Sequence, residues 1–503
     1  MLIALLSLCA FSTLLVVYYR LYLHPLAKYP GPVFARLTDW YNVYHCFKGD
    51  RHIDFVRLHN RYGKIVRYGP NRLSINSVGA LRPIYSATAN TKKANFYEAM
   101  QFYMDIPSTH CTVEKEQHAR KRRILSQAFS DKMLQAYQPL FLKTLTKYLG
   151  RYEKNAGEDS WSGAYDMNHE FSLFVFDAMG GFCFGKPFGA LDDPKKADIV
   201  PPTFEGFQGL NVVGHMHGIA LLHLDSLQPR LKKAIEDYKK YSAELAHECI
   251  ARSSDQKESA CVFDVLLEGY RQKGTDAPSI KELESESSLL VLAGSDSTAN
   301  SLSNVIFNLL NNPHTLERLQ AELRTKFTNL DQICIGPALG DCEYLNACID
   351  ESMRVTPVIG GLTQRATLAG GIEIDGEHVP AKTDVGVPHH AIFRNEEYFA
   401  DPWTYEPMRW MVSENSKEAI RTARAAFWPL GMGLTECIGK KWALIEIKLT
   451  IARMVYKYDL KLVVPDNEKD LTPIERLHRR EEEATDRFTV GSKGPNVRFR
   501  LAK

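Results

Sequence analysis

The chain has 503 residues, of which 45% are hydrophobic and 11% aromatic, so it is long and apolar enough to bury a large core. Its formal net charge is only +2, which argues against a general nucleic-acid binder, and we expect no nucleic-acid partner. Ten cysteines are scattered without a CxxC pair or a dense framework, which favours free thiols in a reducing compartment.

The N-terminus is an uncharged apolar run from Leu2 to Tyr19. About 18 such residues are enough for a helix to cross a bilayer. Basic residues follow the run at Arg20 and Lys28, so the positive-inside rule places the bulk of the protein in the cytoplasm. A cleaved secretory signal is the alternative, but the basic region and small-residue cleavage site that it needs are missing. We predict a single-pass anchor over residues 1–20 and a proline-rich hinge over 21–34.

Residues 35–503 form the remaining predicted domain, in which helical periodicity dominates. Helices are predicted over Asp131–Tyr152, Asp166–Cys183, Gln228–Ala251, Ile280–Leu310, Pro313–Phe327, Tyr344–Met353 and Lys440–Tyr456. Hairpins are predicted for Lys64–Tyr68 with Arg72–Asn76, for Ile372–Val379 around Asp375-Gly376, and for Arg487–Val490 with Val497–Leu501. The charge-rich segment Asn467–Asp486 is expected to be a solvated loop or an exposed helix. The fold class is therefore mainly α with small β-sheets.

The helix that begins at Ile280 is unusually long, and polar residues interrupt its middle. Ser279 and Glu282 make a capping box at its start, and Pro313 ends it after about 30 residues. The stretch LLVLAGSDSTANSL places a glycine and three polar residues between apolar flanks. An exposed polar face is one explanation. Buried carboxylates are seldom tolerated without a purpose, so we interpret the interruption as functional.

Cys437 lies between glycines in FWPLGMGLTECIGKKWAL, directly before a helix-forming segment. A thiolate binds metals and attacks electrophiles, and a helix N-terminus stabilises its negative charge. Nearby glycines would let a flat ligand approach the sulfur closely. A lone cysteine is more often an inert core residue, so this stretch alone does not decide between the two interpretations.

Two further pairs accompany the cysteine. Glu351 and Arg354 are spaced i, i+3 and can form a bidentate ion pair on one helix face, although such a pair is a weak signal alone. His118 and Arg122 are spaced i, i+4 in EQHARKRRILSQAF and could hold an anionic cofactor. The alternative for this second pair is a solvated basic face.

Together and in this order, these features resemble the cytochrome P450 family of haem-thiolate monooxygenases. The resemblance covers nearly the whole chain, from the YPGP hinge through AGSDS and ESMR to the cysteine loop. Local wording such as FRNEEYFADPWTYEPMRWM is most similar to fungal microsomal members of secondary metabolism. The resemblance implies a triangular helical domain that binds haem b, and a protein anchored in the endoplasmic reticulum membrane with its catalytic domain in the cytosol.

The resemblance also implies roles for individual residues. Cys437 would be the axial thiolate ligand, and its electron donation favours O–O cleavage. Proton delivery to dioxygen and the groove for oxygen and substrate would involve Asp296, Ser297, Thr298, Ala293 and Gly294. Glu351, Arg354 and Arg409 would form a structural ion-pair network. The haem propionates would be held by His118, Arg122 and Arg365, and Gly433 and Gly439 would let the loop lie close to the porphyrin.

The cysteine loop departs from the family pattern at several positions. Leu430 replaces a phenylalanine, and Thr435 replaces a cationic residue, so one charge-assisted bond to a propionate is missing. Glu436 adds negative charge beside the ligand, Ser297 replaces a threonine, and Met408 replaces a glutamate. We still expect haem to bind, because thiolate ligation and burial of the macrocycle outweigh one lost ion pair.

Electrons must come from another protein, because the chain carries no nicotinamide or flavin fingerprint. The resemblance implies an NADPH–cytochrome P450 reductase, and Lys121, Arg123, Lys440 and Lys441 could form its basic docking patch. The substrate pocket would be lined by apolar residues, each of which could equally be core packing. These candidates are Phe96, Tyr97, Phe102, Tyr103, Phe204–Met216, Val358–Leu362 and Phe488.

The leading function is oxidation of a mid-sized, largely apolar fungal secondary metabolite with O2 and electrons from NADPH. A haem enzyme that couples or cyclises its substrate without inserting oxygen is the first alternative. The second is a non-catalytic, membrane-anchored binding protein on a decayed haem fold, which Leu430 and Thr435 motivate.

Overall fold

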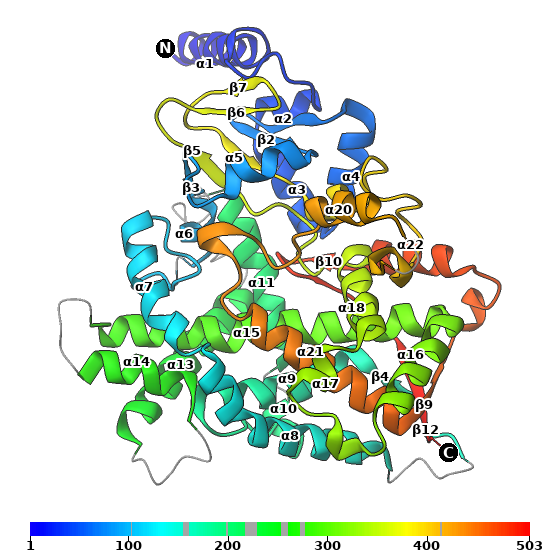
Figure 1. The fold of residues 1–503 in the computed structure, drawn as a ribbon. Coiled ribbons are helices and arrows are strands. Elements are labelled where there is room, and N and C mark those ends of the chain that lie inside the picture. Colours follow the sequence, from blue (N-terminus) through cyan, green and yellow to red (C-terminus); the bar gives the residue numbers. More distant parts are fainter. Residues whose placement is uncertain are drawn as a thin grey trace.

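The computed structural model describes residues 1–502 except 102, 154–159, 198–199, 217–228, 253–259, 272–276 and 413–414. Figure 1 shows a triangular outline, with α1 at the narrow end and α15 crossing the broad helical part. The helices are α1 Leu2–Tyr18, α2 Val33–Leu37, α3 Trp40–Lys48, α4 Arg51–Tyr62, α5 Leu81–Tyr85, α6 Phe96–Met100, α7 Lys115–Gln127, α8 Asp131–Glu153, α9 Met167–Phe184, α10 Pro194–Ala197, α11 Val200–His215, α13 Pro229–Ala251, α14 Val262–Arg271, α15 Ile280–Asn311, α16 Pro313–Lys326, α17 Pro337–Gly340, α18 Glu343–Val355, α19 His389–Ile392, α20 Lys417–Ala426, α21 Lys440–Lys457 and α22 Pro473–Glu483.

The strands are short and belong to small sheets. They are β1 Ile65–Gly69, β2 Arg72–Ile75, β3 Thr91–Lys93, β4 Tyr165–Asp166, β5 Arg365–Thr367, β6 Ile372–Ile374, β7 Glu377–Val379, β8 Asp384–Gly386, β9 Tyr458–Leu462, β10 Thr485–Asp486, β11 Val490–Gly491 and β12 Asn496–Leu501. The largest sheet has the order β1-β2-β8-β5-β3, in which β2 and β8 run parallel. These elements confirm the predicted mainly α fold with small sheets.

The helical core forms around α15, which packs against α9, α13, α18 and α21. Its capping box is present as predicted, since Ser279 and Glu282 bond to each other's backbone N–H groups. Aromatic side chains from α8, α9 and α21 stack beside it, with Trp442 and Phe182 4.8 Å apart between ring centroids. A second apolar cluster lies on the sheet side and includes Tyr85 and Trp428. The segment that carries Cys437 joins these two parts of the molecule.

Each predicted helix is present with ends within two residues of the prediction, although Gln228 lies outside the described residues. The hairpins around residues 70 and 375 are also present. The third predicted hairpin is wrong, because β12 pairs with β9 and β4 whereas Val490 pairs with Asp486. The strand pattern identified β12, but alternation along one strand does not specify its partner.

The charge-rich segment after residue 467 is not simply solvated. It contains α22, whose Leu477, Arg480 and Glu481 are buried. Arg480 donates to the hydroxyl of Ser303 on α15 over 3.0 Å, and Glu481 is paired with Arg394. Charged residues at helical spacing can therefore line a buried face when each one meets a partner.

The N-terminal helix stands apart from the folded domain. Leu2–Leu23 is continuous helix with a mean hydropathy of 2.2, and its apolar window is not buried against the rest of the chain. The helix ends at Leu23, slightly beyond the predicted boundary of residue 20, because a π-helical turn extends α1. An apolar helix of this length is compatible with a single-pass anchor.

Candidate active site

The loop before α21 holds Cys437 through backbone hydrogen bonds. The Cys437 N–H donates to the Leu430 carbonyl oxygen over 2.8 Å, and the Cys437 carbonyl accepts from Lys440 N–H over 3.2 Å. Gly433 adopts a φ of 67°, in the left-handed region that favours glycine. A Cβ there would lie 2.1 Å from the Tyr85 carbonyl oxygen, so this glycine permits close contact with α5. Figure 1 shows the loop descending beside α7 to the middle of α15.

The thiol of Cys437 is accessible although neighbouring elements surround it. Burial raises the pKa of the thiol, while the Gly439 backbone N–H and the Arg122 guanidinium oppose that rise. The backbone N–H of Gly439, at the N-terminus of α21, therefore lowers the pKa of the thiol, but by less than burial raises it. Gly439 lies close enough that a Cβ on it would be 4.0 Å from Sγ. A metal ion would deprotonate the thiol directly, since a coordinating thiol binds as the thiolate.

Beside the loop is a cavity of about 290 Å³ with a strongly cationic lining. Its basic lining residues are Lys92, Lys93, Lys115, His118, Arg122, Arg123 and Arg365. No Asp or Glu belongs to the described lining of this cavity. The predicted propionate residues His118, Arg122 and Arg365 are thus brought together, and the cavity is suited to a multiply charged anion.

Arg365 and His118 lie close to other cationic side chains of this cavity. Arg365 donates to the hydroxyl of Thr435 and, over 3.4 Å, to that of Tyr97. Burial lowers the pKa of His118 to about 3, and the charges of Lys93, Arg122 and Arg365 contribute. His118 is therefore neutral at pH 7 and would serve as a hydrogen-bond donor rather than as a cation.

Lys93 is a cationic residue of this cavity that the sequence did not reveal. It is buried at the end of β3, and its Nζ donates to the carbonyl of His110 over 2.6 Å. Burial and the nearby charge of Arg365 lower the pKa of Lys93 to about 7. Its position in TKKANF carries no spacing signal, because only the pairing of β3 with β5 places it beside Arg365.

The polar interruption of α15 has two faces. Ala293 is exposed, and the partly buried Ser297 donates its hydroxyl to the Ala293 carbonyl over 2.7 Å. Asp296 is buried and accepts from Asn300 over 3.0 Å and from Thr489. Burial raises the pKa of the Asp296 carboxyl, and those hydrogen bonds oppose the rise. Ser297 therefore borders open space, whereas Asp296 is held from behind by Thr489.

Gly294 and Thr298 lie where α15 packs against the rest of the protein. A Cβ at Gly294 would lie 2.1 Å from Cε of Met179, so the glycine lets α9 pack against α15. Thr298 is buried. Of the two small residues predicted to form a groove, Ala293 is the one whose side chain faces open space.

The ExxR pair is fully buried and is the centre of a network. Arg354 donates to the two carboxylate oxygens of Glu351 over 2.7 and 2.9 Å, and Arg409 approaches the same carboxylate at 3.4 Å. Trp410 also donates to it over 2.9 Å, a contact that the sequence analysis missed. Burial would raise the pKa of Glu351, but Arg354 holds it below its usual value. The network fixes α18 to the segment that precedes the cysteine loop.

Comparison with known proteins identifies the family. The model of the family described as Cytochrome P450 matches residues 30–483. This chain belongs to the cytochrome P450 family. It is 35% identical over 499 residues to the cytochrome P450 monooxygenase atnE of Emericella nidulans, covering 96% of this chain and 93% of that protein.

Other fungal cytochrome P450 proteins are similar over nearly the same length. The cytochrome P450 monooxygenase apf7 of Gibberella fujikuroi is 32% identical over 471 residues, covering 90% of this chain and 89% of that protein. Averantin hydroxylase of Dothistroma septosporum is 30% identical over 455 residues, with coverage of 90% and 84%. The chain is therefore a haem-thiolate oxidoreductase, and its cofactor is haem b. Its relatives are monooxygenases of fungal secondary metabolism.

The residues present fit a haem of this family. Cys437 offers an accessible sulfur, and the cationic cavity next to Thr435 suits the propionates. Thr435 does not supply a charge, but its hydroxyl accepts a hydrogen bond from Arg365. Glu436 is paired with Lys440 at 2.5 Å, which offsets its negative charge beside the thiol. The departures of the cysteine loop thus keep its ability to bind an anionic cofactor.

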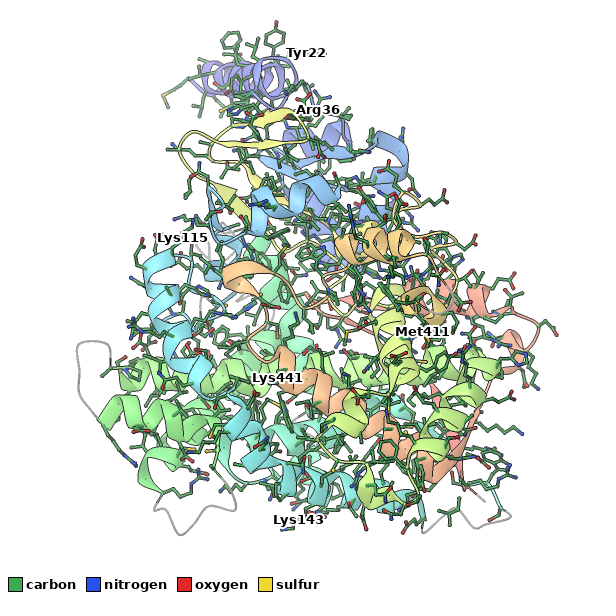
Figure 2. The ribbon with its side chains drawn as sticks, viewed as in Figure 1. Tyr22, Arg36, Lys115, Lys143, Met411 and Lys441 are labelled. Atoms are coloured by element: carbon green, nitrogen blue, oxygen red, sulfur yellow. The ribbon has the colours of Figure 1, made fainter. Side chains whose placement is uncertain are left out.

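One residue of the predicted docking patch is wrongly placed. Lys121 is buried, donates to the Pro107 carbonyl and lies 3.6 Å from Glu282, so it cannot contact a partner protein. Helical spacing predicted its helix correctly but not its face. Arg123, Lys440 and Lys441 are exposed. Figure 2 labels Lys441, at the start of α21, near the middle of the view.

The predicted pocket aromatics form one cluster. Phe488 stacks on Phe96 with centroids 6.0 Å apart and contacts Tyr97 edge-on at 6.4 Å. Its φ of 93° is unusual for a bulky residue and holds the ring in this position. Phe102 lies outside the described residues, as do the side chains of residues 204–207.

Proposed function

We propose that this cytochrome P450 is a membrane-anchored monooxygenase that oxidises a mid-sized, largely apolar fungal secondary metabolite or an intermediate in its biosynthesis. The observation that carries this proposal is the accessible Cys437 thiol beside a cationic cavity, in a chain with an intact ExxR network. Haem bound there would supply dioxygen activation, with its reactivity tuned by the thiolate. The protein's own residues then bind, orient and protonate.

A sulfur atom would bind the iron of the cofactor, and cationic side chains would bind its propionates. Cys437 would ligate the iron, with Gly433 and Gly439 keeping the loop close. Arg122 and Arg365 would pair with the propionates, and Lys93 and neutral His118 would donate hydrogen bonds to them. The support is that these side chains converge on a single cavity and that no described acid competes for them there.

Proton delivery would use the α15 interruption. Ser297 offers a partly exposed hydroxyl next to the exposed Ala293, and it would pass a proton from there to a bound reactant. Asp296 would exchange protons with solvent through Thr489, since its carboxyl is buried and its pKa is raised. The buried Thr298 would support this turn of the helix from the core side.

Membrane attachment would involve more than α1. The domain exposes large apolar side chains on α2 and α3, where Trp40, Tyr44 and Phe47 follow the i, i+4, i+7 spacing of one helix face. Val33 and Phe34 extend this surface towards the anchor. We infer a single pass in the endoplasmic reticulum membrane with the catalytic domain in the cytosol.

Electrons would come from NADPH through a membrane-bound cytochrome P450 reductase. The exposed cations Lys440 and Lys441 follow Cys437 closely in the sequence, and the exposed Arg123 lines the cavity beside the cysteine loop. An acidic flavin domain would be steered to this surface by charge.

The test is turnover of the purified, haem-loaded protein with reductase, NADPH and 18O-labelled dioxygen. Candidate fungal metabolites include averantin, which a relative is named for hydroxylating. Incorporation of one labelled oxygen per product supports the monooxygenase. Product formation without label would favour coupling or cyclisation instead. A protein that binds the metabolites but never consumes NADPH would favour the decayed binding protein.

A further inference from the structure

Buried polar side chains between α3, α4 and α11 carry atoms without hydrogen-bond partners among the described residues. They are Asn42 Nδ2, Arg51 Nη2, both amide atoms of Asn211, His215 Nε2 and Asp486 Oδ2. None of these five residues is more than 4% exposed, and Asn211 is 0% exposed. We call these five residues the polar cluster. An unpartnered buried polar atom destabilises the fold, so such a concentration calls for a ligand or ordered water.

The members of the polar cluster are neighbours in space. Arg51 Nε donates to Asn42 Oδ1 over 2.7 Å, joining α4 to α3. A Cβ at Gly361 would lie 3.0 Å from Arg51 Nη1 and 3.6 Å from Asp486 Oδ2, which brings these two charged groups to one place.

Helix α11 closes the same region. Its Val212 packs against Val43 and Cys46 of α3, between Asn211 and His215 in the sequence. Asn211 and His215 are spaced i, i+4 and so share one face of α11.

The protonation of His215 follows from its contacts. Its Nδ1 lies 3.3 Å from Arg72 Nη1 and 3.3 Å from Gln364 Nε2. Arginine can only donate, so Nδ1 is the acceptor and the proton sits on Nε2. Burial, with the charges of Arg51 and Arg72, lowers the pKa of His215 well below its usual value, so the ring is neutral. His215 therefore presents one unpartnered N–H donor.

Donors outnumber acceptors in the polar cluster. Asn42, Arg51, Asn211 and His215 offer N–H groups, against one amide oxygen of Asn211 and one carboxylate oxygen of Asp486. The nearby cations have carboxylates beside them, because Arg51 and Asp486 both lie near Gly361, and Arg72 is paired with Asp39 at 2.9 Å and lies opposite Asp384 on β8. An excess of donors without an excess of positive charge matches an uncharged oxygen acceptor better than a carboxylate.

The polar cluster adjoins the predicted substrate space. The His215 ring packs on Phe96 with centroids 4.5 Å apart, and Phe96 stacks on Phe488. A Cβ at Gly214 would lie 2.6 Å from the Phe96 ring, so the glycine lets α11 approach α6 closely. From Phe96 the contacts continue through Tyr97 to Arg365 at the cysteine loop. A molecule held at the polar cluster could therefore extend its apolar part along these aromatic rings.

We propose that the polar cluster binds a carbonyl oxygen at one end of the substrate, a ketone, lactone or ester carbonyl, remote from the carbon that is oxidised. This inference rests on the proposed function and narrows its substrate class to apolar molecules with a terminal carbonyl. Asn211 and His215 donate to that oxygen from α11, while Phe96 and Phe488 contact the apolar body. The carbonyl fixes which end of the substrate points away from the cysteine loop.

The test compares 9-fluorenone with fluorene, two flat molecules of the same shape that differ by one carbonyl oxygen. Binding to the purified haem-loaded protein is measured by the shift of its Soret band. The wild type is expected to bind the ketone about tenfold more tightly than the hydrocarbon. In Asn211→Leu, and in Asn211→Asp, which keeps the shape but loses the N–H donors, the ratio should fall to about threefold or less, because only the His215 donor remains on α11. Gln208→Leu, one turn earlier on α11, is the matched control and should keep the wild-type ratio.

A second measurement needs no ligand. Because the Asn211 amide has no partner among the described residues, Asn211→Leu should unfold at the same temperature as the wild type or a higher one. A clear loss of thermal stability would mean that bound water satisfies the amide as part of the fold, and would overturn the carbonyl site.

Equal affinities of the wild type for the two probes, including no response to either, would also overturn the carbonyl site. Failure of the proposed function is distinguishable, because it would show in the turnover experiment as product without labelled oxygen or as no consumption of NADPH. With labelled product formed, a wild-type affinity ratio of one counts against the carbonyl site alone.

Discussion

The hydroxyl of Thr435 accepts a hydrogen bond from the guanidinium of Arg365. Thr435 stands where the cytochrome P450 family usually carries a cation. The loop therefore lacks that positive charge, but the Thr435 hydroxyl orients the charged guanidinium of Arg365. Arg365 also donates to the Gln364 carbonyl over 2.9 Å, which helps to fix its direction. The departure from the family pattern therefore leaves the cationic lining of the cavity in place, and Thr435 contributes to it by orienting Arg365.

Thr435→Val is expected to weaken haem retention moderately. The variant keeps the shape of Thr435 but loses the acceptor, so Arg365 becomes less well oriented. Transfer of haem to excess apomyoglobin should become about 2- to 10-fold faster, the effect of one hydrogen bond. Thr435→Ser retains the hydroxyl and should behave like the wild type. Equal transfer rates for all three proteins would show that the hydrogen bond has no role in holding haem.

Loss of the Glu351 carboxylate is expected to be severe. Glu351→Gln leaves the buried Arg354 guanidinium without its counter-charge, at a cost of about 3–5 kcal/mol. The expected result is little folded, haem-loaded protein, measured as haem-to-protein ratio and thermal unfolding temperature. Arg409→Gln removes a longer contact and leaves the Glu351–Arg354 pair in place, so it should cost clearly less than Glu351→Gln. Equal losses in both variants would contradict this ranking.

Lys93 is expected to make haem retention depend on pH. In the haem-free protein burial lowers the pKa of Lys93 to about 7, whereas a nearby propionate favours its charged form. Haem binding then takes up a proton above pH 7, so affinity should fall as pH rises towards 9. We expect about 3- to 10-fold faster haem loss at pH 9 than at pH 7. Lys93→Met should lose most of this dependence, and an unchanged profile would exclude Lys93 from the propionate site.

Glu446 is expected to lower stability as pH rises. It is fully buried on α21, both carboxyl oxygens lack partners among the described residues, and burial raises its pKa to about 8. A folded-state pKa above the unfolded one means that stability is lost between about pH 4.5 and pH 8. Glu446→Met removes this loss, so its advantage in thermal unfolding temperature should grow across that range. A constant difference between the two proteins would show that Glu446 does not titrate there.

Charge reversal of the proposed reductase-docking surface is expected to slow electron entry. Lys440→Glu combined with Lys441→Glu should reduce the rate of first-electron transfer from the reductase about tenfold at low salt, with convergence at high salt. Lys326→Glu on α16 changes an exposed cation elsewhere and serves as the control. Stopped-flow reduction under carbon monoxide measures the step. If the rate is the same in the double variant as in the wild type at low salt, the reductase docks elsewhere.

The sequence predicted features that local spacing controls. The capping box at Ser279 set the start of α15, and the i, i+3 spacing of Glu351 and Arg354 produced the buried pair. Cys437 and its glycines were recognisable because consecutive residues determine the conformation of this loop. Family resemblance then supplied the roles that spacing alone left open.

Features made by distant segments were not predictable in the same way. The partner of β12, the burial of Lys121 and the role of Lys93 each depend on which element packs nearby. The polar cluster joins residues separated by more than 400 positions, from Asn42 to Asp486, and no local pattern marks them. A helix pattern shows that a face exists but not what covers it.

The most direct test of Cys437 as the iron ligand is the carbon monoxide difference spectrum of the purified, dithionite-reduced protein, with Cys437→Ser alongside. We expect a strongly red-shifted Soret band for the wild type and its loss in Cys437→Ser, since the thiolate ligand produces that shift. A blue-shifted band in the wild type, or a well-folded protein without any haem band, would contradict the assignment of Cys437 as the iron ligand.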